Sequence, residues 1–331
     1  MLIGLTYDLR ADYLAAGYSE EETAEFDGVA TIDAIDAALR AIGHQTDRIG
    51  SGRQLVDRLA AGNRWDLVFN LTEGLHGTAR ESQVPAILDL YEIPYTFSDP
   101  LVLAVCLHKG LTKTVVGQAG LPTTPFVLIK KIEDVEAIDL PYPLFAKPVA
   151  EGTGKGISAN SKIKDRDSLR RICLELLASC RQPVLVETFL PGREFTVGLA
   201  GRGDSAEVLG MIEVNFKAGS GEIYSYQTKT DYETLVTYSV PDDAVAREAA
   251  QVALAAWRAL RCVDAGRADI RCDAAGRPNF IEVNPLAGLN PTHSDLPILC
   301  RMNGIDFTQL IGRIMTEART RQGLGLSLIH I

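Results

Sequence analysis

Two apolar runs near the N-terminus are separated by a segment of helical periodicity. Leu2–Leu5 and the centre of Asp66–Asn70 are continuous apolar runs of the length typical of buried strands. Between them apolar residues recur at helical spacing, and Gly43 marks the end of that helix. Strand, helix and strand in this order predict a small parallel α/β domain over residues 1–98. The apolar positions of the helix are Ile32, Ile35, Leu39 and Ile42.

The rest of the chain predicts two further units. Residues 99–185 contain a helical stretch around Lys109–Gly117, the proline-bounded run Tyr142–Pro148 and a glycine-rich loop. Residues 186–322 alternate helices with strand-like runs at 195–199, 208–214 and 280–283. The segment 323–331 matches no preceding element, so we regard it as a tail foreign to the natural protein. The last predicted helix carries on one face Phe307, Leu310, Ile311, Ile314 and Met315.

Composition excludes several classes of protein. The 331 residues are 46% hydrophobic, which is enough for a large core in two or three domains. A net charge of -10 spread along the chain argues against nucleic acid or an anionic membrane as the main partner. Because the sequence shows no signal peptide and no membrane-spanning run, we expect a cytoplasmic protein. Six scattered cysteines are typical of buried thiols rather than of a zinc site or disulfide framework.

Four polar residues stand at alternating positions on two predicted strands. Arg267 and Asp269 share one face of their strand, and Glu282 and Asn284 share one face of the next. The intervening Asp273–Gly276 predicts a hairpin turn. Such a hairpin gathers oxygen donors that suit magnesium, which takes its other ligands from water and nucleotide phosphates. Two ordinary strands with exposed polar faces are the competing interpretation.

A lysine and a glycine-rich loop form a second candidate site. Lys147 ends a predicted strand, and the loop Glu151–Ile157 follows it. An ammonium group beside flexible backbone N–H groups can surround phosphate oxygens. The segment is not a Walker loop, because Val149 replaces its first glycine and no Ser or Thr directly follows Lys155. A surface turn with a solvated lysine is the alternative.

Two glutamates stand at the ends of neighbouring strands. Glu187 closes an apolar run, and Glu194 opens the next strand seven residues later. They could contact the exocyclic amine and the ribose hydroxyls of a nucleotide. Solvated strand ends are the simpler interpretation of either residue alone.

In their order along the chain, these pieces resemble the ATP-grasp ligases and, within them, the D-alanine–D-alanine ligases. The resemblance covers roughly residues 64–300. Any single piece is common, whereas the ordered set is specific. The matching pieces are His76-Gly-Thr with Glu81, Glu92-Ile-Pro-Tyr95, Lys109, Ala119-Gly-Leu-Pro122, Lys147-Pro148, Glu151-Gly-Thr153, Glu187, Gly192-Arg-Glu194-Phe-Thr-Val197, Lys229, Arg267, Asp269, Glu282, Asn284, Gly288 and Ser294.

The resemblance implies a fold of α/β and α+β type, a three-domain ATP-grasp architecture with ATP between the central and C-terminal domains. It also implies two Mg²⁺ ions, with Mn²⁺ as an alternative, and a homodimer. Its ATP-binding residues would be Lys109 and Lys147 for the α- and β-phosphates, Glu151, Gly152 and Gly154 in a closing lid, Glu187 for adenine, Glu194 for ribose and Lys229 for the terminal phosphate. The metal ligands would be Asp269, Glu282 and Asn284, and the substrate-binding residues Arg267, Thr153, Gly288 and Ser294.

The family joins a carboxylate to an amine through an acyl phosphate, and formation of D-alanyl-D-alanine is the favoured reaction. A related ligase acting on other amino acids or amines is one alternative, and a catalytically inactive nucleotide-binding regulator is another. The sequence departs from the family at Thr153 and Thr230, which replace a serine and a tyrosine. The acidic segment 19–25 reads as a solvated loop or helix start, although Glu21, Glu22 or Glu25 could bind the first substrate's amino group.

Overall fold

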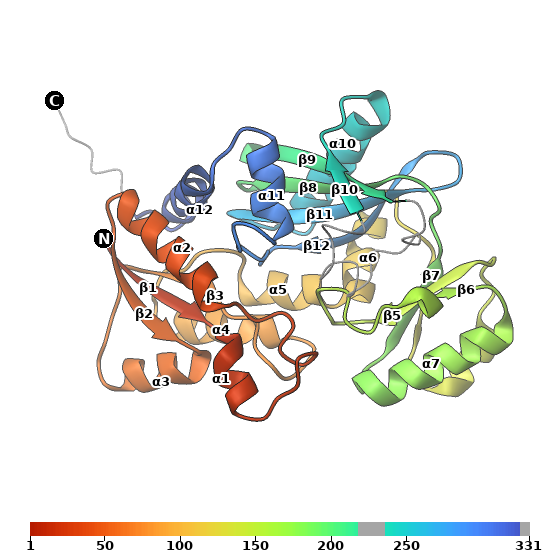
Figure 1. Cartoon of the computed structure of the whole chain (residues 1–331), viewed down its shortest axis with the longest axis horizontal. Helices are drawn as coiled ribbons and strands as arrows, with labels where there is room; N and C mark the ends of the chain where they lie inside the picture. Colours follow the sequence, from red (N-terminus) through yellow and green to blue (C-terminus); the bar gives the residue numbers. More distant parts are fainter. Residues whose placement is uncertain (218–235, 325–331) are drawn as a thin grey trace.

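Three separate sheets divide the chain (Figure 1). The structure, a computed structural model, describes residues 1–217 and 236–324. Two residues of the predicted site, Lys229 and Thr230, lie outside this part, as does most of the predicted tail. None of the helices that the structure describes is both long and apolar enough to cross a bilayer.

The N-terminal sheet is parallel and has the strand order β2-β1-β3. Ile3, Leu5 and Phe69 face the core formed with α2 and the C-terminal helices, while Val68 faces α3 and α4. The predicted strand, helix and strand are confirmed as β1, α2 and β3, with one further strand and two further helices between β1 and β3. The elements are β1 (Leu2–Tyr7), α1 (Arg10–Ala15), α2 (Val29–Ala41), β2 (Gln45–Gly50), α3 (Gly52–Ala60), β3 (Leu67–Leu71) and α4 (Gln83–Leu90).

The central sheet is antiparallel, with the order β4-β7-β5-β6, and α7 packs on one face. The side chain of Asp165 starts α7 by accepting a hydrogen bond from the Ser168 N–H at 2.8 Å. The expected domain boundary at residue 185 lies inside β7, which pairs with β5 as far as Thr188, so we place the boundary after Thr188. The elements are β4 (Phe126–Ile129), β5 (Leu144–Pro148), β6 (Lys162–Ile163), α7 (Arg166–Cys180) and β7 (Val184–Thr188).

Two helices of the expected central unit pack elsewhere. Val102 and Cys106 of α5 (Pro100–Leu107) and Val116 of α6 (Lys109–Gln118) share a buried core with the C-terminal sheet. Apolar side chains on these helices therefore join them to the C-terminal domain, although they precede the central sheet in sequence.

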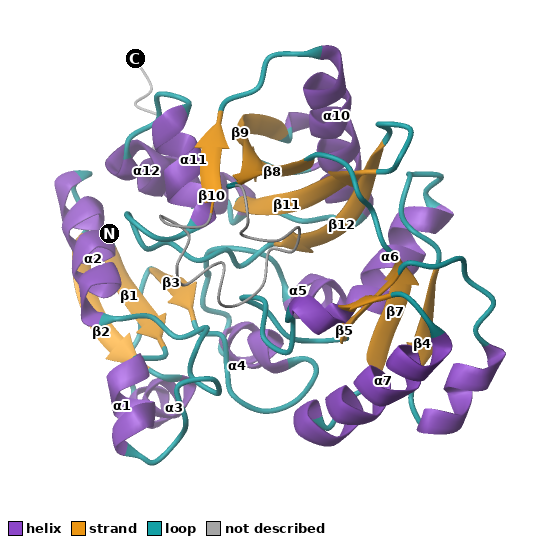
Figure 2. Ribbon diagram, turned by 45° about the vertical axis from the view of Figure 1, so that its right-hand side comes forward, coloured by secondary structure: helices purple, strands orange, loops and turns teal. Residues whose placement is uncertain are grey.

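The C-terminal sheet is antiparallel, with the order β10-β9-β8-β11-β12. Helix α10 covers one face, and α11 and α12 lie between the other face and the N-terminal sheet (Figure 2). The predicted apolar face of the last helix is confirmed, since Leu310, Ile311, Ile314 and Met315 are buried. The elements are β8 (Glu194–Ala200), β9 (Glu207–Phe216), β10 (Val236–Ser239), α10 (Ala244–Ala259), β11 (Ala265–Cys272), β12 (Pro278–Asn284), α11 (Asp295–Met302) and α12 (Phe307–Arg321).

A buried ion pair joins the end of the N-terminal domain to the last helix. Arg321 Nη2 lies 2.9 Å from Asp264 Oδ2 and donates to the carbonyl oxygens of Tyr95 and Phe97 at 2.8 and 3.1 Å. Asp264 Oδ2 also accepts a hydrogen bond from the Phe97 N–H at 2.7 Å. The Asp264 side chain is only 1% exposed, so this joint is enclosed by the two domains that it connects.

Candidate functional site

The predicted hairpin of polar residues is present. β11 pairs with β12 so that Arg267 faces Asn284 and Asp269 faces Glu282. The Asp273 N–H donates to the Arg277 carbonyl oxygen at 2.9 Å and closes the turn between the strands. Directly opposed residues on antiparallel strands have side chains within contact distance. The hairpin therefore brings two carboxylates, one amide and one guanidinium onto a single patch of sheet.

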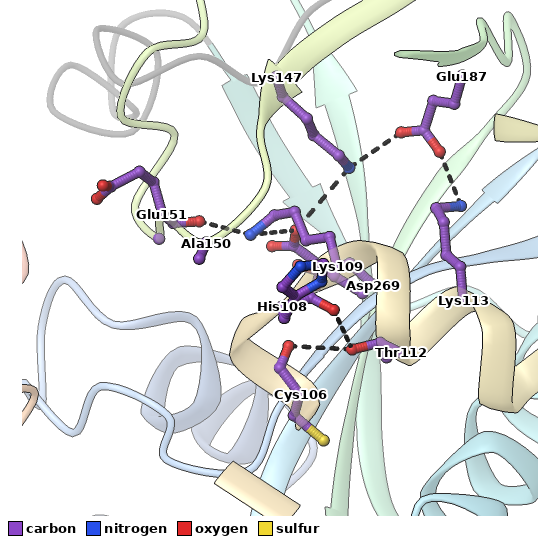
Figure 3. Close-up of polar contacts among 12 residues, drawn as sticks. Cys106, His108, Lys109, Thr112, Lys113, Lys147, Ala150, Glu151, Glu187 and Asp269 are labelled. Atoms are coloured by element: carbon purple, nitrogen blue, oxygen red, sulfur yellow. Dashed lines mark hydrogen bonds and ion pairs between the residues drawn. The ribbon is translucent and has the colours of Figure 1, made fainter. Parts of the chain in front are cut away.

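Two lysines from other parts of the chain converge on this patch. Lys109 begins α6 and Lys147 lies on β5, and their Nζ atoms are 3.5 and 4.0 Å from Glu282 Oε2. Figure 3 shows Lys109 and Lys147 extending toward the region of Asp269. Both lysine side chains are buried. An anionic ligand at this position would therefore meet two ammonium groups that are shielded from water.

Glu187 on β7 is held by two lysines (Figure 3). Its Oε1 lies 3.0 Å from Lys147 Nζ, and its Oε2 lies 2.7 Å from Lys113 Nζ and accepts from Thr124 Oγ1 at 2.6 Å. Burial alone would raise the pKa of Glu187, but Lys113 and Lys147 outweigh it and hold the pKa at about 2. Glu187 is thus a fixed, ionised hydrogen-bond acceptor.

A cavity between the central and C-terminal sheets, which we term the hinge cavity, contains most of the predicted ATP-binding residues. Phe189 forms part of its wall, and the Arg271 guanidinium lies 5.2 Å from the centre of that ring. Arg271 Nη1 is 2.8 Å from Glu194 Oε2. The predicted residues that line the hinge cavity are Lys109, Lys147, Glu151, Gly154, Glu187, Glu194, Asp269 and Glu282.

A second cavity, which we term the inner cavity, adjoins the first, since Lys109, Glu151 and Glu282 line both. Ser294 lies behind its wall, where a side chain on Gly288 would come within 2.8 Å of Ser294 Oγ. Gly288 therefore permits a close approach that no larger residue allows. The other predicted residues that line the inner cavity are Gly152, Thr153, Arg267 and Asn284.

The glycine-rich loop is fastened to the N-terminal domain by Arg80 and Glu25. Arg80 Nη2 lies 2.6 Å from Glu25 Oε2, and Arg80 Nη1 donates to the Ala150 carbonyl oxygen at 2.7 Å. Glu25 Oε1 accepts from the Gly152 N–H at 2.6 Å. The prediction that segment 19–25 is solvated is therefore wrong for Glu25, whose side chain is 10% exposed because it is paired with Arg80.

The donor set at the hairpin fits a hard divalent cation. Asp269 and Glu282 supply carboxylate oxygens, and Asn284 supplies an amide oxygen that, oriented toward Arg267, accepts from its guanidinium at 3.0 and 3.2 Å. In the described residues, no three His, Cys, Asp or Glu side chains cluster as a metal site by themselves. Two carboxylates with one amide leave coordination positions for water and phosphate oxygens, which is the arrangement that Mg²⁺ favours.

The sequence interpretation missed several residues that line the two cavities or hold their walls in place. Lys113 follows Lys109 by one helical turn, and this spacing could have indicated that both lysines face the same side. Glu25 and Arg80 are distant in sequence, and no local pattern signals their contact. The other missed residues are Glu73, Phe189 and Arg271.

Comparison with known proteins identifies the family and the fold. Residues 115–316 match the family model described as the D-ala D-ala ligase C-terminus. A D-alanine–D-alanine ligase of Cupriavidus metallidurans is 32% identical over 286 residues, covering 85% of this chain and 84% of that protein. The ATP complex of a Bacillus anthracis D-alanine–D-alanine ligase superposes with a TM-score of 0.73 at 21% identity, covering 98% of this chain and 99% of that one. A D-Ala:D-Ser ligase of Enterococcus faecalis gives 0.71 at 21% identity, covering 96% and 99%. The ATP-grasp fold is thereby confirmed, and the chain belongs to the D-alanine–D-alanine ligase family.

Proposed function

We propose that this protein is an ATP-dependent carboxylate–amine ligase that joins two molecules of D-alanine. The observation that carries the proposal is the convergence of Lys109 and Lys147 on Glu282 beside Asp269. Buried cations next to paired carboxylates suit a nucleotide polyphosphate and its metal ion better than any neutral ligand. The family relationship supports the choice of D-alanine.

The hinge cavity would hold ATP. Glu187 can accept a hydrogen bond from the exocyclic amine of adenine, because Lys113 and Lys147 keep it ionised. Phe189 and Glu194 line this cavity, where Phe189 would offer an aromatic face and Glu194 would accept from the ribose hydroxyls. Lys109 and Lys147 would neutralise phosphate oxygens.

The reaction activates a carboxylate and then replaces the activating group. A carboxylate oxygen of the first amino acid attacks the γ-phosphorus of ATP, the bond to the β-phosphate oxygen breaks, and ADP leaves. The neutral amine of the second amino acid then attacks the acyl carbon, forming the amide bond, losing a proton and expelling phosphate. Arg267 and the backbone at Gly288 line the inner cavity, where they would stabilise the oxyanion of this second step.

Asp269, Glu282 and Asn284 would hold Mg²⁺, and we propose two ions. Bound Mg²⁺ would offset charge on the phosphate oxygens during transfer. The lysines and Arg267 supply the remaining positive charge from the chain itself. This local field explains how a protein with a net charge of -10 would accept a polyanion.

The loop at Gly152–Gly156 would act as a lid over the acyl phosphate. Arg80 and Glu25 hold its beginning against the N-terminal domain. Of the three acids left open by the sequence, only Glu25 lines the inner cavity, so we propose that a substrate amino group faces Glu25 and its neighbours. A homodimer and a cytoplasmic location are further proposals, which rest on the family relationship and on the use of ATP.

An ADP-release assay with Mg²⁺ and D- or L-amino acids, singly and in pairs, tests the proposal. D-alanine alone should support ADP release and yield the dipeptide, which mass spectrometry would identify. Lys147→Ala and Glu282→Ala should lower the rate by at least about 100-fold while circular dichroism shows a folded protein. Glu248→Gln, at an exposed position on α10, is the matched control.

Substantial turnover in either folded variant would contradict the assigned roles. A requirement for two different substrates would favour a related ligase, and the likeness to a D-Ala:D-Ser ligase makes that the second candidate. ATP binding without turnover on any amino acid would indicate a nucleotide-binding regulator.

A further inference from the structure

Strand β11 carries a row of three charged residues on the face that lines the candidate site. Every second residue of the strand belongs to the apolar core that it shares with α10, namely Ala268, Ile270 and Cys272. The residues between them therefore point to the opposite face, where Arg267 lines the inner cavity and Asp269 and Arg271 line the hinge cavity. The proposed function gives roles to Arg267 and Asp269, and Arg271 extends the same row by one step.

Arg271 is fixed by a carboxylate and an aromatic ring. It lies directly opposite Glu194 on the neighbouring strand β8, and its Nη1 donates to Glu194 Oε2 at 2.8 Å. The two side chains are 13% and 15% exposed. The guanidinium also lies 5.2 Å from the centre of the Phe189 ring, and Lys162 Nζ lies 4.2 Å from the same centre. Arg271 thus joins the acid proposed for ribose to the aromatic wall of the hinge cavity.

The bond from Arg271 determines how Glu194 can meet a ligand. A charge-assisted hydrogen bond from an arginine holds a carboxylate in one orientation. A carboxylate has about four acceptor positions, so Glu194 can accept from Arg271 and from two hydroxyl groups at once. Glu194 also carries the same sign of charge as the phosphates that the cavity would hold. The guanidinium offsets this repulsion at the point where the ribose would lie.

The order of the row matches the order of groups in a nucleotide complex. Two residues along a strand span about 6.7 Å, so Arg271 lies one such step beyond Asp269, on the side away from Arg267. The proposed metal site is at Asp269, and the nucleoside would lie at the next step. We propose that Arg271 is a positioning residue that aims Glu194 at the ribose hydroxyls, so that the protein selects ribonucleotides over nucleotides lacking these hydroxyls. This inference rests on the proposed ATP site and adds a residue that sets its nucleotide specificity.

Calorimetric titration of the full chain tests the inference without any amino acid. Dissociation constants are measured for ATP and for 2′,3′-dideoxy-ATP, each with Mg²⁺. We expect the parent protein to bind ATP about tenfold or more tightly, the range for hydrogen bonds to a charged group, and Arg271→Met to reduce this preference below about threefold. Arg271→Lys keeps the charge but loses the fixed geometry, so it should retain part of the preference.

The matched control is Arg277→Met. Arg277 belongs to the same hairpin and lies 2.8 Å from the carboxylate of Asp273, but its side chain is 76% exposed. This variant should keep the preference of the parent protein. Glu194→Gln should lose the preference, and the double variant Arg271→Met/Glu194→Gln should lose no more than either single variant, because the two residues act through one contact.

Steady-state kinetics separates positioning from a catalytic or purely structural role. Arg271→Met should raise KM for ATP several-fold and keep kcat within about twofold, because Arg271 would not touch the reacting atoms. An equal loss of affinity for ATP and dideoxy-ATP in Arg271→Met would show a purely structural role and overturn the inference. An undiminished preference in the folded variant would overturn it as well. The expected preferences without ADP release on any amino acid would support the inference while contradicting the proposed ligase activity, whereas a parent protein that binds no ATP would contradict both.

Discussion

Lys113→Met removes one of the two cations that hold Glu187. In the folded protein Lys113 Nζ lies 2.7 Å from Glu187 and donates to the hydroxyls of Thr123 and Thr124 at 2.9 and 2.8 Å. Removing one partner of a buried ion pair costs about 3–5 kcal/mol. Because Lys147 still contacts Glu187, we expect the lower end, a loss of about 3 kcal/mol in the free energy of unfolding.

The double variant Lys113→Met/Glu187→Gln tests whether this cost comes from the charge pair. If it does, removing both charges should cost about 2 kcal/mol less than the sum of the two single substitutions. Equilibrium urea unfolding, followed by the fluorescence of Trp65 and Trp257, measures each free energy. Lys130→Met, at an exposed lysine near β4, should change the free energy by no more than about 0.5 kcal/mol. Additive effects of the two substitutions would refute the reasoning.

Two further predictions concern the lid and the acid stability. Arg80→Met should free the beginning of the lid and admit water, so that ADP forms in several-fold excess over ligated product. The control Arg53→Met, at an exposed site, should keep the ratio of ADP to ligated product near one. An unchanged ratio in Arg80→Met would contradict the attachment of the lid by Arg80. The pKa of Glu187 falls from 4.5 to about 2 on folding, so its contribution of about 3 kcal/mol is present above pH 4.5 and is lost as the pH falls toward 2. Glu187→Gln should therefore flatten the decline of urea midpoints between pH 5 and 3, and an equally steep decline would count against this assignment.

Local patterns predicted the elements that local forces determine. The apolar periodicity of α2 and α12 and the hairpin turn before β12 are properties of short segments, and the structure confirms them. Strand alternation and one turn predicted that Asp269 and Glu282 lie on one hairpin, and the structure adds the register that sets them opposite each other. Only the resemblance to a family predicted that Lys109 and Lys147 lie in one site. No local rule relates the start of a helix to a strand that is distant in sequence.

The contacts that could not be predicted from the sequence are those between domains. Glu25 lies in a run of acids that would normally be solvated, and its burial depends on Arg80 and on the lid backbone at Gly152. The packing of α5 on the C-terminal sheet could not be predicted from the sequence either, because the apolar residues of α5 could have covered the central or the C-terminal sheet. Such choices are settled by the whole fold and not by the propensity of a segment.

The joint between Arg321, Asp264 and Phe97 affects how the molecule can open. It anchors the end of the N-terminal domain to the last helix, and α11 and α12 already share a core with the first sheet. These two domains should therefore move as a single body, and the central sheet should swing relative to them once the contacts of Arg80 with Ala150 and of Glu25 with Gly152 are released. ATP entry and product release would then depend on one hinge rotation near Thr188. The hinge cavity and the inner cavity, which share lining residues, would open and close together.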